Sequence, residues 1–233
     1  MAIKKNAGRN RIVAILILLL PASLLVFLST RGCSHKFEEL PDYGIASDYH
    51  FIDGRGKSFS SKDFKDKIVV ITTLQLTCPD SCAISMWHVD QAIYQHIRKN
   101  KKKLKQVKII SFVTDGKGNP ITDLSMLTES MKDNVEGYDP EIWFLASGNP
   151  RSVFDFKFND QSLLQKGGNY FGGEAFTELM LLLDKQNHLR MVNRGNAEGT
   201  IRRMYQHIAL LQKQYDKAMK AKMMKSKSYS NSQ

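Results

Sequence analysis

Two cysteines four positions apart are the side chains best suited to chemistry in this sequence. Cys78 and Cys82 lie in the stretch Thr-Cys-Pro-Asp-Ser-Cys, where Pro79 restricts the backbone between them. A thiolate is the attacking species in disulfide exchange and a ligand for soft metal ions such as Cu(I). The pair therefore predicts redox chemistry or metal binding, and the alternatives are a purely structural disulfide or an inert pair.

The segments that flank the motif predict how it is held. The run 68–71 is short and rich in β-branched residues, which is typical of a buried strand. From Ala83 to Arg98 apolar residues recur at helical spacing. The motif is thus expected where a strand passes into a helix. There, unpaired backbone N–H groups and the positive end of the helix dipole would favour the thiolate.

The remaining periodic segments predict an α/β fold. A strand at 106–114 after the helix completes a strand–helix–strand unit, which implies parallel pairing. Turn residues between two apolar runs predict hairpins at both ends of the domain. The other expected elements are strands at 49–52, 57–59, 141–146, 179–184 and 189–192, and helices at 123–134, 150–158 and 198–220.

The amino-terminal segment predicts a membrane anchor. Residues 12–28 carry no charge, and Ser29 and Thr30 extend the run to 12–30, close to the roughly 20 residues that a spanning helix needs. Basic residues precede the run, so the positive-inside rule places residues 1–11 in the cytoplasm. We expect a single-pass protein of the inner (cytoplasmic) membrane whose carboxyl-terminal domain lies in the periplasm. A cleaved signal peptide and acylation of Cys33 are the alternatives.

Composition and charge predict the remaining domain boundaries and the kind of partner. We expect a linker at 31–48, one domain at 49–217, and a basic, disordered tail at 218–233. The formal net charge of +11 suggests nucleic acid as a partner. No nucleic-acid motif is present, however, and the basic residues after the anchor are expected to lie outside the cytoplasm. We therefore predict no nucleic-acid partner, and contact with anionic lipid or solvent instead.

The order of elements resembles the thioredoxin fold, a central mixed β-sheet flanked by helices, here with an amino-terminal β-hairpin. The Cys-Pro-Asp-Ser-Cys motif spaces its cysteines by three residues, and in this it resembles the SCO/SenC family. Leu40–Gly44, Leu183–Lys185 and Leu189-Arg190 support a likeness from about 40 to 215. The resemblance implies a membrane-anchored protein that assists maturation of the binuclear copper site of cytochrome c oxidase, by carrying copper or by reducing thiols.

One position departs from the family pattern. Family members that bind copper use both cysteines and a histidine eight residues before the position of Asp184, and this chain has Phe176 there. The copper site that the resemblance implies is therefore incomplete. Met86 is a soft donor that could replace the histidine, although a methionine on an amphipathic helix is more often a core residue.

Three functions follow from the motif and the resemblance. The first is a thiol–disulfide oxidoreductase, in which Cys78 attacks a disulfide of an oxidase subunit or copper chaperone and Cys82 resolves the mixed disulfide. The second is a chaperone that holds Cu(I) with the same two cysteines. The third is a binding module without catalysis. Hydrolytic triads and phosphate-binding loops find no support in the sequence.

Overall fold

The computed structural model describes residues 39–76, 86–100, 105–115, 118–154, 157–158, 161–162, 179–194 and 198–230, together with 17, 19–21, 23–27 and 29. The chain divides into two compact units, Met1–Glu38 and Glu39–Gln233. The described positions of the first unit are helical. Within the described part of the chain no helix has both the length and the apolar character needed to cross a membrane. The anchor expected at 12–30 lies partly outside these residues and stays a prediction.

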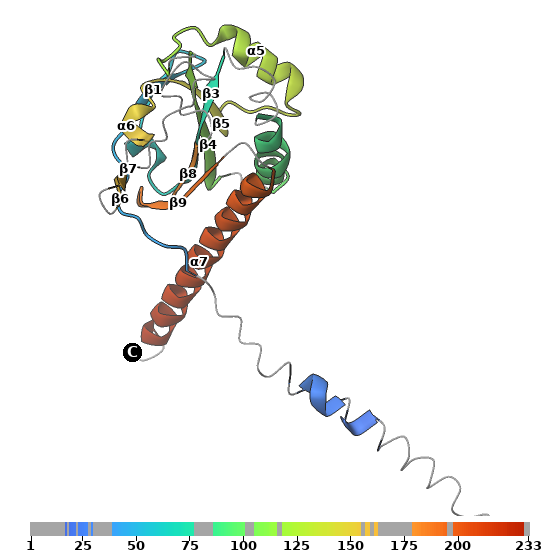
Figure 1. Cartoon of the computed structure of the whole chain (residues 1–233). Coiled ribbons are helices and arrows are strands. Elements are labelled where there is room, and N and C mark those ends of the chain that lie inside the picture. The colour runs from blue at the N-terminus through green and yellow to red at the C-terminus, as the bar shows by residue number, and fades with distance from the viewer. Residues whose placement is uncertain are drawn as a thin grey trace, which may run out of the picture. The chain divides into compact units, whose positions relative to one another are not determined.

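The second unit is built on a mixed seven-stranded sheet of order β2-β1-β5-β4-β3-β8-β9 (Figure 1). Three central strands, β3, β4 and β5, run parallel, and β8 pairs antiparallel with β3. This confirms the predicted α/β class and mixed sheet. The strands are β1 His50–Asp53, β2 Ser58–Ser60, β3 Ile68–Gln75, β4 Val107–Thr114, β5 Trp143–Ser147, β8 Leu179–Leu183 and β9 Leu189–Arg194, while β6 Lys157–Phe158 and β7 Gln161–Ser162 pair separately.

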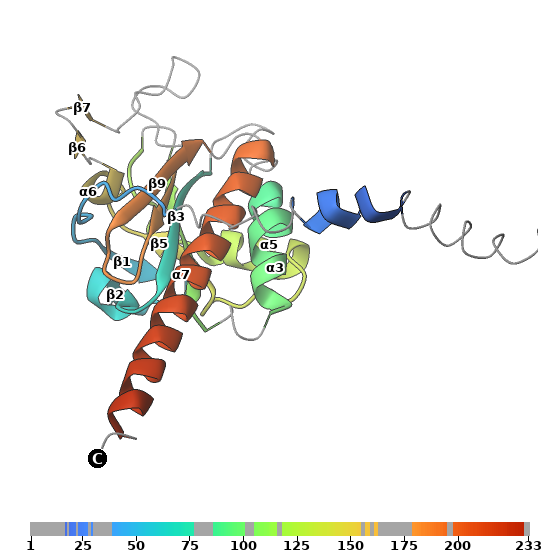
Figure 2. The same ribbon diagram turned by 90° about the horizontal axis from the view of Figure 1, so that it is seen from below.

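Helices cover both faces of the sheet. Residues 86–98 form a continuous helical stretch made of an α-helical turn at 86–89, a π-helix and α3. Figure 2 shows α3, α5 and the first turns of α7 on one side of the sheet, and α6 on the other. The named helices are η1 Ser61–Phe64, η2 Asp90–Tyr94, α3 Gln95–Arg98, α5 Ser125–Asn134, α6 Arg151–Phe154 and α7 Glu198–Ser230.

Two hydrophobic cores lie on opposite faces of the sheet because successive strand side chains point to opposite sides. Ile68 and Val70 of β3 belong to the core beneath the helix 86–98, α5 and α7. Val69 and Ile71 belong to the other core, which contains Tyr49 and many phenylalanines. All eight residues of β3 are buried, as the apolar run predicts for a central strand covered on both faces.

The domain boundaries differ from the expected ones at both ends. Part of the range predicted as a linker, 39–48, belongs to the compact unit, because Leu40 and Ala46 are buried and Ala46 N–H donates to the Asn187 carbonyl. At the other end, α7 continues to Ser230 through most of the tail for which we expected disorder. Residues 217–227 are rich in Lys, Ala and Met and hold no Gly or Pro, a composition that favours helix.

Candidate functional site

The candidate site follows β3, the central strand of the sheet. Cys78 and Cys82 themselves lie in 77–85, outside the described residues, so the structure places their surroundings. The last residues before them are fixed, since Leu76 N–H donates to the Thr114 carbonyl at 3.0 Å and so extends the pairing of β3 with β4. The strand before the motif is therefore confirmed, and the motif begins at the carboxyl end of the central parallel strands.

The helix after the motif is confirmed from residue 86 onward. Its apolar face is buried in the core, where Ile93 and Ile97 are fully covered and Val89 is 5% exposed. Met86 is partly buried and packs against the same core, as a core methionine does. The described helix therefore fixes the position of Met86, the first described residue after the cysteine segment.

A π-helix, Asp90–Tyr94, interrupts this helix and was not predicted. The amide of buried Gln95 donates to the Asp90 carboxylate at 2.8 Å, a pairing five residues apart. In an α-helix such residues lie on different sides, whereas the wider π-helical turn brings positions five apart onto one side. The π-helix thus allows a buried carboxylate to be satisfied within the helix that follows the cysteines.

The helix is also tied to the loop after α5. The Gln95 amide donates to the Glu136 carbonyl at 3.0 Å, and the Tyr94 hydroxyl donates to the Gly137 carbonyl. The same hydroxyl accepts the N–H of Asp139 at 2.8 Å. Burial raises the pKa of Tyr94, so its proton remains available for this bond at neutral pH. These contacts anchor the helix at its far end from the motif.

The loop that follows β4 lies beside the end of β3 and is held by its own side chains. Asp115 accepts both the backbone N–H of Asn119 at 2.8 Å and its side-chain amide at 2.9 Å. Thr114 and Pro120 form an isolated bridge across the same loop. Hydrogen bonds to the Asp115 side chain therefore hold this loop, which follows β4 next to the end of β3.

Phe176, the position of the family histidine, lies outside the described residues, close before β8. The register of β8 against β3 is set by three pairs, Val69 with Leu183, Val70 with Leu182 and Ile71 with Leu181. Each step forward in β3 is therefore one step back in β8. This relation gives a physical basis for the expectation that position 176 and the cysteines are neighbours.

An exposed aromatic residue and a groove lie just beyond the motif. Trp87 is 58% exposed, an unusual state for so large an apolar side chain. It lies at one end of a cavity of about 400 Å³ between the helix 86–98 and the first turns of α7. His96 stacks on Tyr205 in this groove, with ring centroids 4.7 Å apart.

Two polar residues of the β8–β9 turn have structural roles. His188 pairs with Asp42 at 2.8 Å in the β8–β9 turn, and this turn lies at the end of the sheet opposite the motif. Asp184 accepts the N–H groups of Gln186 and His188 and so shapes that turn. Within the described ranges no three His, Cys, Asp or Glu side chains are grouped so that they could hold a metal ion.

A protein-family model and several solved structures match most of this chain. The SCO1/SenC family model matches residues 38–211. Among curated proteins, no match is found. A SCO1/SenC family lipoprotein from Bacillus anthracis matches with a TM-score of 0.53 and 19% identity over 73% of this chain and 96% of its own.

Two further solved structures show the same fold at low identity. BsSco, described as a Sco-family cytochrome c oxidase assembly protein with a disulfide switch, matches with a TM-score of 0.52 and 12% identity over 76% of this chain and 98% of its own. Apo Sco1 from Thermus thermophilus matches with a TM-score of 0.50 and 18% identity over 77% and 99% of the two chains.

Proposed function

The chain belongs to the SCO1/SenC family, and on this basis we propose that it assists copper-site assembly of cytochrome c oxidase through thiol–disulfide exchange at Cys78 and Cys82. The observation that carries the proposal is the position of the motif, between a fully buried central strand and a helix packed against the core. Two cysteines suffice for exchange, whereas the family's copper site also needs a nitrogen that Phe176 lacks. The disulfide switch reported for BsSco agrees with this choice.

The exchange needs only the two thiols and a disulfide on the target. The Cys78 thiolate attacks one sulfur of that disulfide, and the target's other sulfur leaves as a thiolate. Cys82 then attacks the Cys78 sulfur and releases the target as a dithiol. Two electrons pass to the target, and the chain is left with a Cys78–Cys82 disulfide. A separate dithiol reductant must return it to the reduced form before the next cycle.

Thiol trapping across a glutathione redox series tests this pair directly. We expect Cys78 and Cys82 to become alkylatable together, because a disulfide releases both thiols in one two-electron step. The measurement is mass spectrometry of the full-length protein carrying Cys33→Ser, so that only the pair is counted. Wild type is the control for that substitution. Thiols that remain alkylatable under strong oxidant would leave the non-catalytic binding module as the better hypothesis.

Copper binding by the same cysteines is the second candidate. Two thiolates suit Cu(I), which accepts low coordination by soft ligands, and the donor set present fits this ion better than Cu(II). Copper is then cargo that is passed to the oxidase or received from a copper chaperone, and these are the protein partners that we propose. Under this candidate, copper added to the medium would replace the function of the cysteines.

We also propose that residues 12–30 anchor the chain in the inner membrane with the domain in the periplasm. The uncharged run and the basic residues before it support this topology. An alkaline phosphatase fused after Gln233 is expected to be active in a bacterial host, since that enzyme needs periplasmic disulfides. A β-galactosidase fusion at the same position is the control. Activity of the second fusion alone would reverse the proposed orientation, and radiolabelled palmitate would reveal acylation of Cys33.

A further inference from the structure

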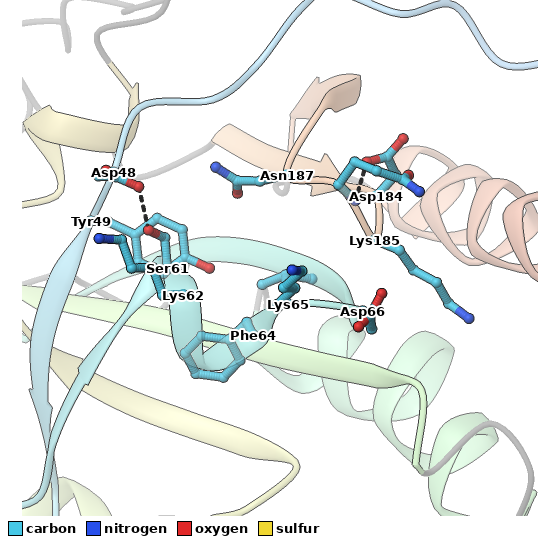
Figure 3. Close-up of a pocket in the computed structure, with 12 residues that line it drawn as sticks. Asp48, Tyr49, Ser61, Lys62, Phe64, Lys65, Asp66, Asp184, Lys185 and Asn187 are labelled. Atoms are coloured by element: carbon cyan, nitrogen blue, oxygen red, sulfur yellow. Dashed lines mark hydrogen bonds between the residues drawn. The ribbon is translucent and has the colours of Figure 1, made fainter.

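The carboxyl-terminal part of α7 continues beyond the sheet as an exposed helix. Tyr215 still belongs to the domain, because it packs against the core and its hydroxyl accepts the N–H of Lys185 in the β8–β9 turn (Figure 3) at 3.3 Å. From Lys217 to Met224 every side chain is exposed. Figure 1 shows this end of α7 extending away from the sheet. We call residues 217–230 the α7 extension; at 1.5 Å per residue it is roughly 21 Å long.

The α7 extension and the turn before it are strongly basic. Between positions 213 and 227 the sequence has six lysines and a single carboxylate, that of Asp216. The first four of these lysines have described side chains, and all four are exposed. This excess of positive charge favours a negatively charged partner and opposes the pairing of two copies of the extension. The six lysines are Lys213, Lys217, Lys220, Lys222, Lys225 and Lys227.

Two methionines form an apolar stripe along the same helix. Met219 and Met223 are one helical turn apart and therefore lie on one side, with exposed fractions of 51% and 59%. They continue the line of Tyr215, which packs against the domain core. At 100° per residue, Lys220 and Lys222 lie on opposite sides of this stripe, each about 80° from its middle. The stripe is therefore bordered by a lysine on either side.

This arrangement suits the surface of an anionic bilayer. A helix of this kind lies parallel to the surface, with its apolar side chains toward the acyl chains and its lysine ammonium groups at the level of the phosphates. Each lysine close to an anionic lipid surface strengthens binding about fivefold. The lysines alone would also match an acidic protein. The apolar stripe between them favours a bilayer, because the acyl chains begin just beneath the phosphates.

We propose that the α7 extension binds the surface of an anionic phospholipid membrane, with Met219 and Met223 toward the acyl chains and Lys220 and Lys222 at the phosphates. The proposal does not depend on the chemistry of the cysteines, and it adds a second lipid contact to the anchor proposed at 12–30. The extension leaves the domain beside the β8–β9 turn. The contact is therefore at the end of the sheet opposite the one where the cysteine motif begins.

Hydrogen–deuterium exchange of the full-length protein in lipid nanodiscs tests the proposal. The exposed end of a helix opens readily, so its amides exchange fast unless lipid covers it. We expect the amides of 217–227 to exchange about tenfold more slowly in discs that contain phosphatidylglycerol than in discs of phosphatidylcholine alone. Adding about 0.5 M KCl should remove most of this difference, because salt screens the charges. The buried strand β3 is the internal reference and should exchange alike in both discs.

A double variant, Lys220→Gln/Lys222→Gln, tests the charges. In phosphatidylglycerol discs it should exchange nearly as fast as wild type does in phosphatidylcholine discs, because each lost charge weakens binding about fivefold. Glutamine has a helix propensity close to that of lysine, so exchange in phosphatidylcholine discs should not change. The matched control is Lys99→Gln/Lys132→Gln, which removes two exposed lysines outside the extension and should behave like wild type.

A second double variant, Met219→Gln/Met223→Gln, tests the apolar stripe and should reduce the protection given by phosphatidylglycerol discs. Equal exchange of wild type in the two kinds of disc would overturn the proposal. So would an equal loss of protection in the control and in Lys220→Gln/Lys222→Gln, or full protection without the two methionines. Protection by soluble polyglutamate but not by phosphatidylglycerol would assign this surface to an acidic protein instead.

Discussion

Cells that produce the Cys78→Ser or Cys82→Ser protein are expected to contain no more active cytochrome c oxidase than cells without the protein. Serine keeps the size of the side chain but is a far weaker nucleophile and a poor ligand for soft metals. Either substitution should therefore abolish both disulfide exchange and Cu(I) binding. The measurement is oxidase activity in membranes of a host whose own family member is deleted, complemented with each variant. Cys33→Ser is the matched control and should restore activity.

Two additions to the medium separate the candidates in that experiment. Restoration of the cysteine variants by a thiol reductant would support exchange at Cys78 and Cys82, whereas restoration by copper would favour Cu(I) delivery. Protein levels and unfolding temperatures of the variants are compared with wild type, so that a folding defect is recognised. Full oxidase activity in either stable cysteine variant would contradict both chemistries and leave a binding role.

Phe176→His is expected to convert the chain into a Cu(II)-binding protein with a thiolate-to-copper charge-transfer band. If the β3–β8 register continued beyond its described pairs, position 176 would lie level with Leu76, two residues before Cys78. Imidazole supplies the nitrogen donor that Cu(II) prefers, and a ligand contributing about 3 kcal/mol raises affinity roughly 100-fold. The measurement is anaerobic titration of the reduced protein with Cu(II), followed by visible absorption.

Thr177→His is the matched control for this titration. Alternate residues of an extended segment point to opposite sides, so histidine at 177 should not reach the same metal ion. If Phe176→His shows no charge-transfer band while both cysteines are reduced, the assumed register or the assumed site is wrong. A band already present in wild type would mean that another residue completes the site, and would favour the copper-chaperone candidate.

The sequence predicts those parts of the fold that depend on local pattern. The buried run 68–71 and the turn Lys185–His188 mark β3 and the β8–β9 hairpin because apolar alternation and turn residues act over a few positions. The π-helix at Asp90–Tyr94 was missed, since it depends on a buried carboxylate and its contacts with Gln95. The helical end of α7 was missed because its basic composition was interpreted as disorder.

The candidate sites differ in the same way. Cys78 and Cys82 are recognisable because two reactive residues stand together in one short motif. The cavity lined by Tyr49, Lys65 and Asn187 (Figure 3) is not, because these residues come from segments that only the folded sheet brings together. Each of these residues is ordinary in its own sequence context, and the unpaired Tyr49 hydroxyl becomes visible only when the burial of its neighbours is known.

The pairing of β3 with β8 has a consequence for how the chain folds. Val69 pairs with Leu183 across 114 positions, whereas its other partner, Lys108 in β4, is 39 positions away. Contacts between distant segments close large loops and form slowly, so the strand–helix–strand unit can assemble before β8 reaches it. During that interval one edge of β3 is unpaired. Oxidation or pairing with a foreign strand at this stage would trap the chain before its sheet is complete.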